Sequence, residues 1–164
     1  MKTDVKWISG MEFSGSNALN DSLIVIDYAD SSKGESGRGT TPKQMFLQSV
    51  AGCTGMDVIN ILTKMRSVLP DSFSMEVEGK VAEEEPAVFT NILLTYYFTG
   101  AMDDKALLRA VKLSQEKYCS ISIMVKRICD FEYKIIFNGA EIYNEVTKAS
   151  FIPQDDDSWH SQFC

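Results

Sequence analysis

The first 30 residues alternate apolar and polar side chains in the manner of β-strands. Three short runs show the pattern, VKWIS, MEFSG and SLIVIDYAD, and Gly, Asn and Asp residues separate them. A period of two places every second side chain on one face of a strand, and the separating residues favour turns. We therefore expect a small antiparallel meander over residues 3–30.

The next apolar segment has the pattern of a buried helix. Apolar residues between Phe46 and Arg66 cover nearly all sides of a helix drawn through them, and a helix that is apolar all round is buried. Pro42 suits the first helical turn and Thr41 suits its N-cap. The stretch before it, SSKGESGRGTTP (31–42), is rich in Gly and Ser and predicts a mobile loop.

The rest of the chain predicts a hairpin, two helices and a last strand. Residues 72–85 alternate and are typical of a strand paired with residues 90–100. Asp103 is placed to cap a helix that ends near Tyr118, a second short helix follows, and residues 131–139 predict the last strand. Strands segregated from helices indicate an α+β fold rather than βαβ winding.

Chain length and charge limit the classes of protein. The chain has 164 residues, which fits one domain, and a net charge of −7. An acidic protein has no electrostatic reason to bind nucleic acid or an anionic membrane. We find no apolar run of the about 18 residues that a bilayer requires and no apolar core of a signal peptide at the N-terminus. We expect a cytoplasmic protein.

The four cysteines do not form a metal-binding pattern. They are Cys53, Cys119, Cys129 and Cys164, without a CxxC motif, and the single histidine is His160. We therefore expect no zinc site and no other metal. In a reducing cytosol an isolated cysteine usually behaves as a small hydrophobic residue.

Cys53 lies between two glycines in the most apolar helix. Each glycine inside a helix costs about 1 kcal/mol relative to alanine, so Gly52 and Gly55 suggest that another segment approaches closely. One interpretation is tight packing around a passive cysteine. The other is that Cys119, near the junction of two predicted helices, forms a reversible pair with Cys53. A helix start at Cys119 would offer backbone N–H groups to a thiolate.

Two motifs surround the two cysteines, TPKQMFLQSVAGCTGMDVINILTKMR (41–66) and LSQEKYCSISIM (113–124), in that order. They resemble the OsmC/Ohr family, and within it a YhfA-like branch. EEEPAVFTNILLTYYFTG (83–100) also resembles the hairpin of that branch. The resemblance covers residues 1–137 as one OsmC-like domain, and residues 138–164 form a C-terminal extension outside it. From about Ala140 we expect the chain to be weakly structured or peripheral.

The resemblance implies both a fold and a chemistry. Members of the family are α+β proteins in which antiparallel sheets pack around two central helices of an intertwined homodimer. Many reduce organic hydroperoxides with two cysteines, without a cofactor. By resemblance Cys53 would be peroxidatic and Cys119 resolving, a dithiol such as a dihydrolipoyl group would recycle the disulfide, and Met and aromatic side chains would accept an apolar hydroperoxide.

The sequence departs from the family pattern where the thiol is activated. Peroxidase members carry a glutamate before the first cysteine, and it holds an arginine that stabilises the thiolate. This glutamate stands nine or ten residues before the first cysteine, and in this chain those two positions are Lys43 and Gln44. Gln44 can form hydrogen bonds but not a charge-assisted pair. Arg38 is the candidate arginine, and an exposed loop charge is its alternative interpretation; Lys43 could replace it as a point charge.

Two function classes therefore stay open. The first is a thiol peroxidase that uses Cys53, Cys119, Arg38 and Gln44. The second is a catalytically weak OsmC-like dimer that binds an apolar ligand or senses redox state. Several weaker candidates have ordinary interpretations as surface, core or tail residues: Glu116, Tyr118, Cys129, Cys164 and His160.

Overall fold

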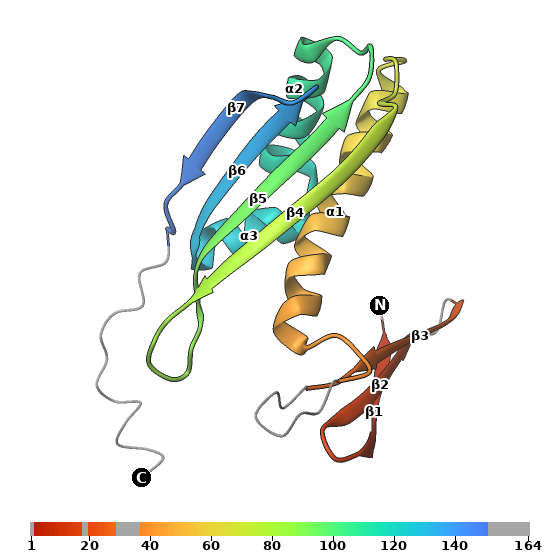
Figure 1. Cartoon of the computed structure of the whole chain (residues 1–164), viewed down its shortest axis with the longest axis vertical. Helices are drawn as coiled ribbons and strands as arrows, with labels where there is room; N and C mark the ends of the chain where they lie inside the picture. The colour runs from red at the N-terminus through yellow and green to blue at the C-terminus, as the bar shows by residue number, and fades with distance from the viewer. Residues whose placement is uncertain (1, 18–19, 29–36, 151–164) are drawn as a thin grey trace. The chain divides into compact units, whose positions relative to one another are not determined.

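The computed structural model describes residues 2–17, 20–28 and 37–150. The chain divides into two compact units, residues 1–48 and residues 49–164, and each is described here by itself. The boundary falls inside the long helix α1 (Pro42–Lys64), whose first turns belong to the first unit. Figure 1 labels the helices and strands of both units.

The first unit is the predicted meander. Strands β1 (Thr3–Ser9), β2 (Glu12–Asn17) and β3 (Asn20–Ile26) form a three-stranded antiparallel sheet in that order. Thr40 then returns to the edge of β3, where it forms backbone hydrogen bonds with Val25 and Asp27. Residues 31–36 of the predicted mobile loop lie outside the described residues.

Helix α1 starts where the sequence predicts. The Gln44 backbone N–H donates to Thr41 Oγ1, and the Gln44 side-chain oxygen accepts from the Thr41 backbone N–H at 3.1 Å. This reciprocal pair is a capping box, which satisfies two backbone donors that a helix start would otherwise leave free. Thr41 is therefore the predicted N-cap, and the helix ends at Lys64, two residues before the expected Arg66.

The second unit is a four-stranded sheet with helices on one face (Figure 1). Its strand order is β4-β5-β6-β7, and the predicted hairpin of β4 (Ser72–Val81) with β5 (Phe89–Thr99) is confirmed. Asp103 caps α2 (Asp104–Leu113) as predicted, by accepting from two backbone N–H groups. One turn of π-helix, η2 (Ser114–Tyr118), leads to α3 (Ser120–Ile128).

The expectation of purely antiparallel sheets is wrong at one pair of strands. β6 (Asp130–Phe137) pairs parallel to β5 in a register that runs from Asn91↔Asp130 to Phe98↔Phe137. The connection between them contains α2, η2 and α3. Parallel neighbours require such a crossover, so the two helices that the sequence predicts determine the direction of β6. The fold class, α+β, is as predicted.

The expectation of a weakly structured or peripheral chain from about Ala140 is wrong in its first alternative for residues 140–147, which form a strand at the edge of the sheet. Strand β7 (Ala140–Thr147) pairs antiparallel with β6 and completes the sheet. Asn138 and Gly139 connect the two strands, with φ of 49° and 85°. Positive φ at both central residues is the reason why Asn-Gly favours tight hairpins. The local signal for this strand is therefore the Asn-Gly pair. The rest of the expected tail, residues 151–164, lies outside the described residues.

The core of the second unit lies between the sheet and the helices. Phe73 stacks on Phe98 with ring centroids 4.3 Å apart, and Tyr96 meets Tyr133 edge to face. Aliphatic side chains from the helices and strands complete this core, and the following are fully inaccessible to solvent: Val50, Val58, Leu62, Ile92, Leu94, Leu107 and Ile135. This packing fixes α1 and α3 on the same sheet face, so side chains of both can meet.

Helix α1 is long and apolar enough to cross a membrane by length and composition alone. This differs from the sequence-based expectation that no apolar run is long enough to span a bilayer. The core helix of a water-soluble protein passes the same test when it is mostly buried, whereas 28% of the apolar window of α1 is buried in this single chain. The part of α1 that belongs to the second unit lies along the sheet of that unit (Figure 1). One of its apolar side chains nevertheless stays open to solvent, because Met56 is 72% exposed.

Candidate active site

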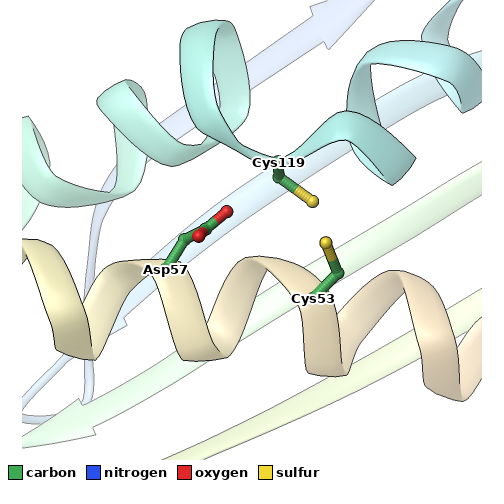
Figure 2. Close-up of side chains that lie close together, drawn as sticks. All are labelled: Cys53, Asp57 and Cys119. Atoms are coloured by element: carbon green, nitrogen blue, oxygen red, sulfur yellow. The ribbon is translucent and has the colours of Figure 1, made fainter. Parts of the chain in front are cut away.

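Two free thiols and one carboxylate meet between α1 and the start of α3. Cys53 and Asp57 lie one turn apart on α1, and Cys119 precedes the first residue of α3. The two sulfur atoms and a carboxylate oxygen all lie within 4.8 Å of one another. Figure 2 shows the two Sγ atoms facing each other across the gap, with the Asp57 carboxylate beside them. The predicted proximity of Cys53 and Cys119 is thus present.

The π-turn η2 places Cys119 at the helix start. The Cys119 backbone N–H donates to the Ser114 carbonyl, and its φ of −74° and ψ of 97° take it out of the helical region. Its sulfur then acts as the N-cap of α3, because it accepts from the Ser122 N–H at 3.4 Å and from Ser122 Oγ at 3.2 Å. Cys119 is completely buried. π-turns often occur at functional sites.

A buried network of polar side chains connects the two cysteine-bearing segments. Thr54, the neighbour of Cys53, places its Oγ1 2.6 Å from the Tyr96 hydroxyl and 2.8 Å from Ser114 Oγ. Gln115 Nε2 donates to the same hydroxyl at 2.6 Å and to Thr54 Oγ1 at 3.2 Å. All four residues are buried. Hydrogen bonds in such surroundings specify one arrangement, so this network fixes the turn before Cys119 against α1.

The two glycines do not admit the segment that carries Cys119. A Cβ at Gly55 would lie 2.5 Å from the Met75 methyl group and 3.6 Å from the Phe73 ring, both on β4. A Cβ at Gly52 would meet nothing within 4 Å. The expected close approach of another segment is therefore present at Gly55, where that segment is β4, and wrong at Gly52. Cys119 approaches on another side of α1, the side to which Cys53 projects (Figure 2).

The glycine side of α1 borders an open apolar groove instead. The groove has a volume of about 520 Å³, and its lining residues are Gly52, Gly55, Met56, Ile59, Asn60, Phe73 and Met75. Nearly all of this lining is apolar. Met56, Met75 and Phe73 are among its walls, and such apolar walls suit an apolar ligand.

The surroundings of Cys53 favour its neutral thiol form. Burial is the largest cause, and together with the hydrogen bond to Cys119 it raises the pKa of Cys53 to about 11 from an ordinary 9.0. The charge of Asp57 raises this pKa further, whereas a hydrogen bond from the Ile121 backbone N–H lowers it. Ile121 lies in the first turn of α3, so the predicted helix-start donor is present. Its effect on the pKa is smaller than that of burial.

Asp57 is a site residue that the sequence pattern did not single out. It is half-buried, and its Oδ2 is inaccessible and has no hydrogen-bond partner among the described residues. The spacing of four residues from Cys53 on one helix face was the available signal. Asp57 also lines a cavity of about 240 Å³ together with Asn60, Lys64 and Tyr118.

Arg38 and Gln44 belong to the first unit, so the structure does not test their predicted roles at Cys53. Arg38 Nη2 donates to Glu12 Oε1 at 2.7 Å and Arg38 Nε donates to Glu12 Oε2 at 3.2 Å. This pair raises the pKa of Arg38, chiefly through the hydrogen bonds. The Gln44 oxygen accepts the Thr41 hydrogen bonds of the capping box.

The weaker candidates are distributed as follows. Glu116 is exposed, and Tyr118 is exposed at the rim of the Asp57 cavity. Cys129 is buried, and its thiol donates to the Val125 carbonyl, as expected of a core residue. Cys164 and His160 lie outside the described residues.

Comparison with known proteins gives one family. A family model described as "OsmC-like protein" matches residues 34–134. Protein YhfA of Escherichia coli K12 is 34% identical over 128 residues, which cover 77% of this chain and 90% of that protein.

Solved structures share the fold. A hypothetical protein from Aquifex aeolicus has 27% identity and a TM-score of 0.69, over 84% of this chain and 96% of that one. A Legionella pneumophila protein described as an organic hydroperoxide resistance protein has 19% identity and a TM-score of 0.60, over 82% and 96% of the two chains.

Proposed function

This chain belongs to the OsmC-like protein family, and from that premise we propose that it reduces organic hydroperoxides with Cys53 and Cys119. The observation that carries the proposal is the pair of free sulfur atoms that face each other within 4.8 Å. A disulfide requires sulfurs about 2.05 Å apart. Rotation of the two side chains toward each other would supply that approach.

The proposed cycle has three steps. The Cys53 thiolate attacks the outer oxygen of ROOH, the O–O bond breaks, and the products are a sulfenic acid on Cys53 and an alkoxide that takes a proton to become ROH. Cys119 then attacks the sulfenic sulfur, and water leaves as the disulfide forms. A dithiol reductant finally exchanges with the disulfide, so that both thiols are restored and the reductant becomes a disulfide.

Exposure supports this division of roles. Cys53 is partly accessible, whereas Cys119 is completely buried. A peroxide from solution can therefore reach Cys53 first, and a resolving thiol needs to reach only the sulfenic acid. The Ser122 donors hold the Cys119 sulfur at the helix start. The groove lined by Met56, Phe73 and Met75 runs along the same helix and would accept the apolar part of the peroxide.

The relatives give this proposal limited support. The Legionella protein is described as an organic hydroperoxide resistance protein, but at 19% identity the similarity shows the fold alone. The two thiols of this chain therefore carry the functional argument.

We further propose that Glu12 takes the place of the missing glutamate. Its carboxylate holds Arg38 through two hydrogen-bonding nitrogens, and the Glu12 side chain is only 17% exposed. A fixed guanidinium is what a thiolate with a raised pKa needs. Glu12→Gln and Arg38→Lys should each slow the reaction of Cys53 with peroxide. Asp4→Asn is the matched control, because Asp4 forms an exposed pair with Lys2 in the same sheet. Equal rates of peroxide reaction in Glu12→Gln, Arg38→Lys and Asp4→Asn would contradict the role proposed for Glu12 and Arg38.

The direct test is consumption of cumene hydroperoxide with dithiothreitol as reductant. Cys53→Ser should lose activity, and Cys119→Ser should leave Cys53 open to oxidation to sulfinic acid, which mass spectrometry detects. Cys129→Ala is the control, because it removes a buried thiol outside the site. Full activity in Cys53→Ser would refute the proposal.

The raised pKa of Cys53 favours a second candidate, a catalytically weak protein that binds an apolar ligand in the groove or senses redox state. A thiol with a pKa of about 11 contains little thiolate at neutral pH. The second-order rate constant with cumene hydroperoxide separates the two candidates. A value no higher than that of free cysteine supports binding or sensing, and a much higher value supports the peroxidase.

We propose a homodimer as the working assembly. All residues of β1 are exposed, including Val5 at 61% and Trp7 at 62%. Neighbouring apolar side chains at the surface of a small sheet mark an interaction site, and a second copy is the occupant that the family resemblance implies. Light scattering after size-exclusion chromatography should give twice the chain mass. A monomer at micromolar concentration would exclude the dimer.

A further inference from the structure

The three side chains at the candidate active site also form a set of metal ligands. Cys53 and Asp57 share one face of α1, and Cys119 faces them from the start of α3 (Figure 2). Two sulfurs and a carboxylate oxygen within 4.8 Å of one another form the mixed donor set that Zn²⁺ and Cd²⁺ bind in proteins. The expectation of no metal rested on spacing along the chain, whereas Asp57 and Cys119 are distant in the chain and meet only in the fold.

The Asp57 carboxylate lacks the partner that a buried oxygen needs. Its Oδ2 is inaccessible to solvent and accepts no hydrogen bond among the described residues. An unpartnered buried acceptor is unfavourable, and more so when it is charged. A cation bound by Asp57 and the two sulfurs would give this carboxylate a partner.

The groups around the sulfurs fit a metal-thiolate site. Ser122 donates to the Cys119 sulfur through its N–H and its hydroxyl, and the Ile121 N–H donates to Cys53. Such donors orient metal ligands and stabilise their charge.

We propose that Cys53, Asp57 and Cys119 bind one thiophilic divalent cation such as Zn²⁺ when both thiols are reduced. Zn–S bonds of about 2.3 Å in a tetrahedral site place two sulfurs roughly 3.8 Å apart, so the three side chains need to contract only slightly. Binding releases the two thiol protons and transfers no electrons. The same sulfurs cannot hold the metal and form a disulfide, so the metal-bound and oxidised states exclude each other.

Cd²⁺ is the probe, because its thiolate bonds give a charge-transfer absorption band. The reduced full chain should bind one Cd²⁺ with this band, and Cys53→Ser or Cys119→Ser should weaken binding at least tenfold. A variant with both Cys129→Ala and Cys164→Ala controls for the other two thiols and should bind like the wild type. Cd²⁺ binding that is lost when Cys129 and Cys164 are replaced, and kept when Cys53 or Cys119 is replaced, would overturn the proposal.

Asp57→Asn tests the carboxylate, and Glu116→Gln is its matched control because Glu116 is exposed on the turn before Cys119. Asp57→Asn should weaken Cd²⁺ binding at least tenfold, whereas Glu116→Gln should not change it. Equal affinities in the two variants would remove Asp57 from the site. Urea denaturation of each variant without metal separates a lost ligand from a lost fold.

Oxidation gives an independent test. Protein whose Cys53–Cys119 disulfide has been formed with diamide should not bind Cd²⁺, and dithiothreitol followed by removal of the reductant should restore binding. Unchanged binding after oxidation would overturn the proposal. None of these measurements uses peroxide turnover, so they stand or fail separately from the proposed peroxidase activity.

Discussion

Removal of one buried hydroxyl should reveal how the site is held together. In Thr54→Val the side chain keeps its shape but loses Oγ1, which interacts with Tyr96, Ser114 and Gln115. Each hydrogen bond contributes about 0.5–1.5 kcal/mol net, so three bonds give bounds of roughly 1.5–4.5 kcal/mol. The Tyr96 hydroxyl keeps its bond from Gln115, and Ser114 Oγ keeps its bond to the Thr54 carbonyl. We therefore expect the lower half of this range, about 1.5–3 kcal/mol of lost stability.

Thr63→Val is the matched control on the same helix. Thr63 is exposed, and its hydroxyl bonds only locally to the Ile59 carbonyl at 2.8 Å. Both variants make the same change in helix propensity, so that contribution cancels in the comparison. An exposed substitution of this kind should change stability by less than about 0.5 kcal/mol.

The assay is urea denaturation of both variants with thiols reduced and at one protein concentration, because association would shift the midpoint. Thr54→Val should lower the midpoint without a change in the denaturant slope. It should also slow diamide-driven formation of the Cys53–Cys119 disulfide, since the network holds the turn before Cys119. Equal stability of the two variants would refute this reasoning.

Three residue positions or pairs on α1 provide three further tests: the two glycines, the Cys53 thiol and the Asp57 carboxylate. Gly52→Ala should stabilise the protein by up to about 1 kcal/mol because its Cβ meets open space, and Gly55→Ala should gain less, because its Cβ would lie 2.5 Å from the Met75 methyl group, the end of a flexible side chain that must move aside. Urea midpoints of the pair check this, and the reverse order would contradict it. Because only the thiolate reacts and the pKa of Cys53 is about 11, alkylation of Cys53 by iodoacetamide should rise about tenfold per pH unit above neutrality; a plateau near neutral pH would speak against the raised pKa. Asp57→Asn should speed this alkylation at a fixed pH, because loss of the negative charge lowers the pKa of Cys53, and an unchanged rate would exclude that electrostatic effect.

The elements of the fold were readable where local patterns are strong. The alternation in β4, the capping residues Thr41 and Asp103, and the apolar helix after Pro42 all act over a few neighbours in the chain. The strand β7 also has a local signal, Asn138-Gly139, whose positive φ angles fit a tight hairpin. The parallel direction of β6 is not local, because it depends on how the crossover returns to the sheet.

The sequence by itself determined most of the elements before β7, the family resemblance and the choice of Cys53 and Cys119. Only the tertiary structure decided what surrounds them. It brought Asp57 beside both sulfurs, turned Gly55 toward Met75, and connected Thr54 to Tyr96. Periodicity and capping act between residues that are neighbours in the chain, whereas these contacts join residues far apart in it, and only the packing of helices on the sheet brings such residues together.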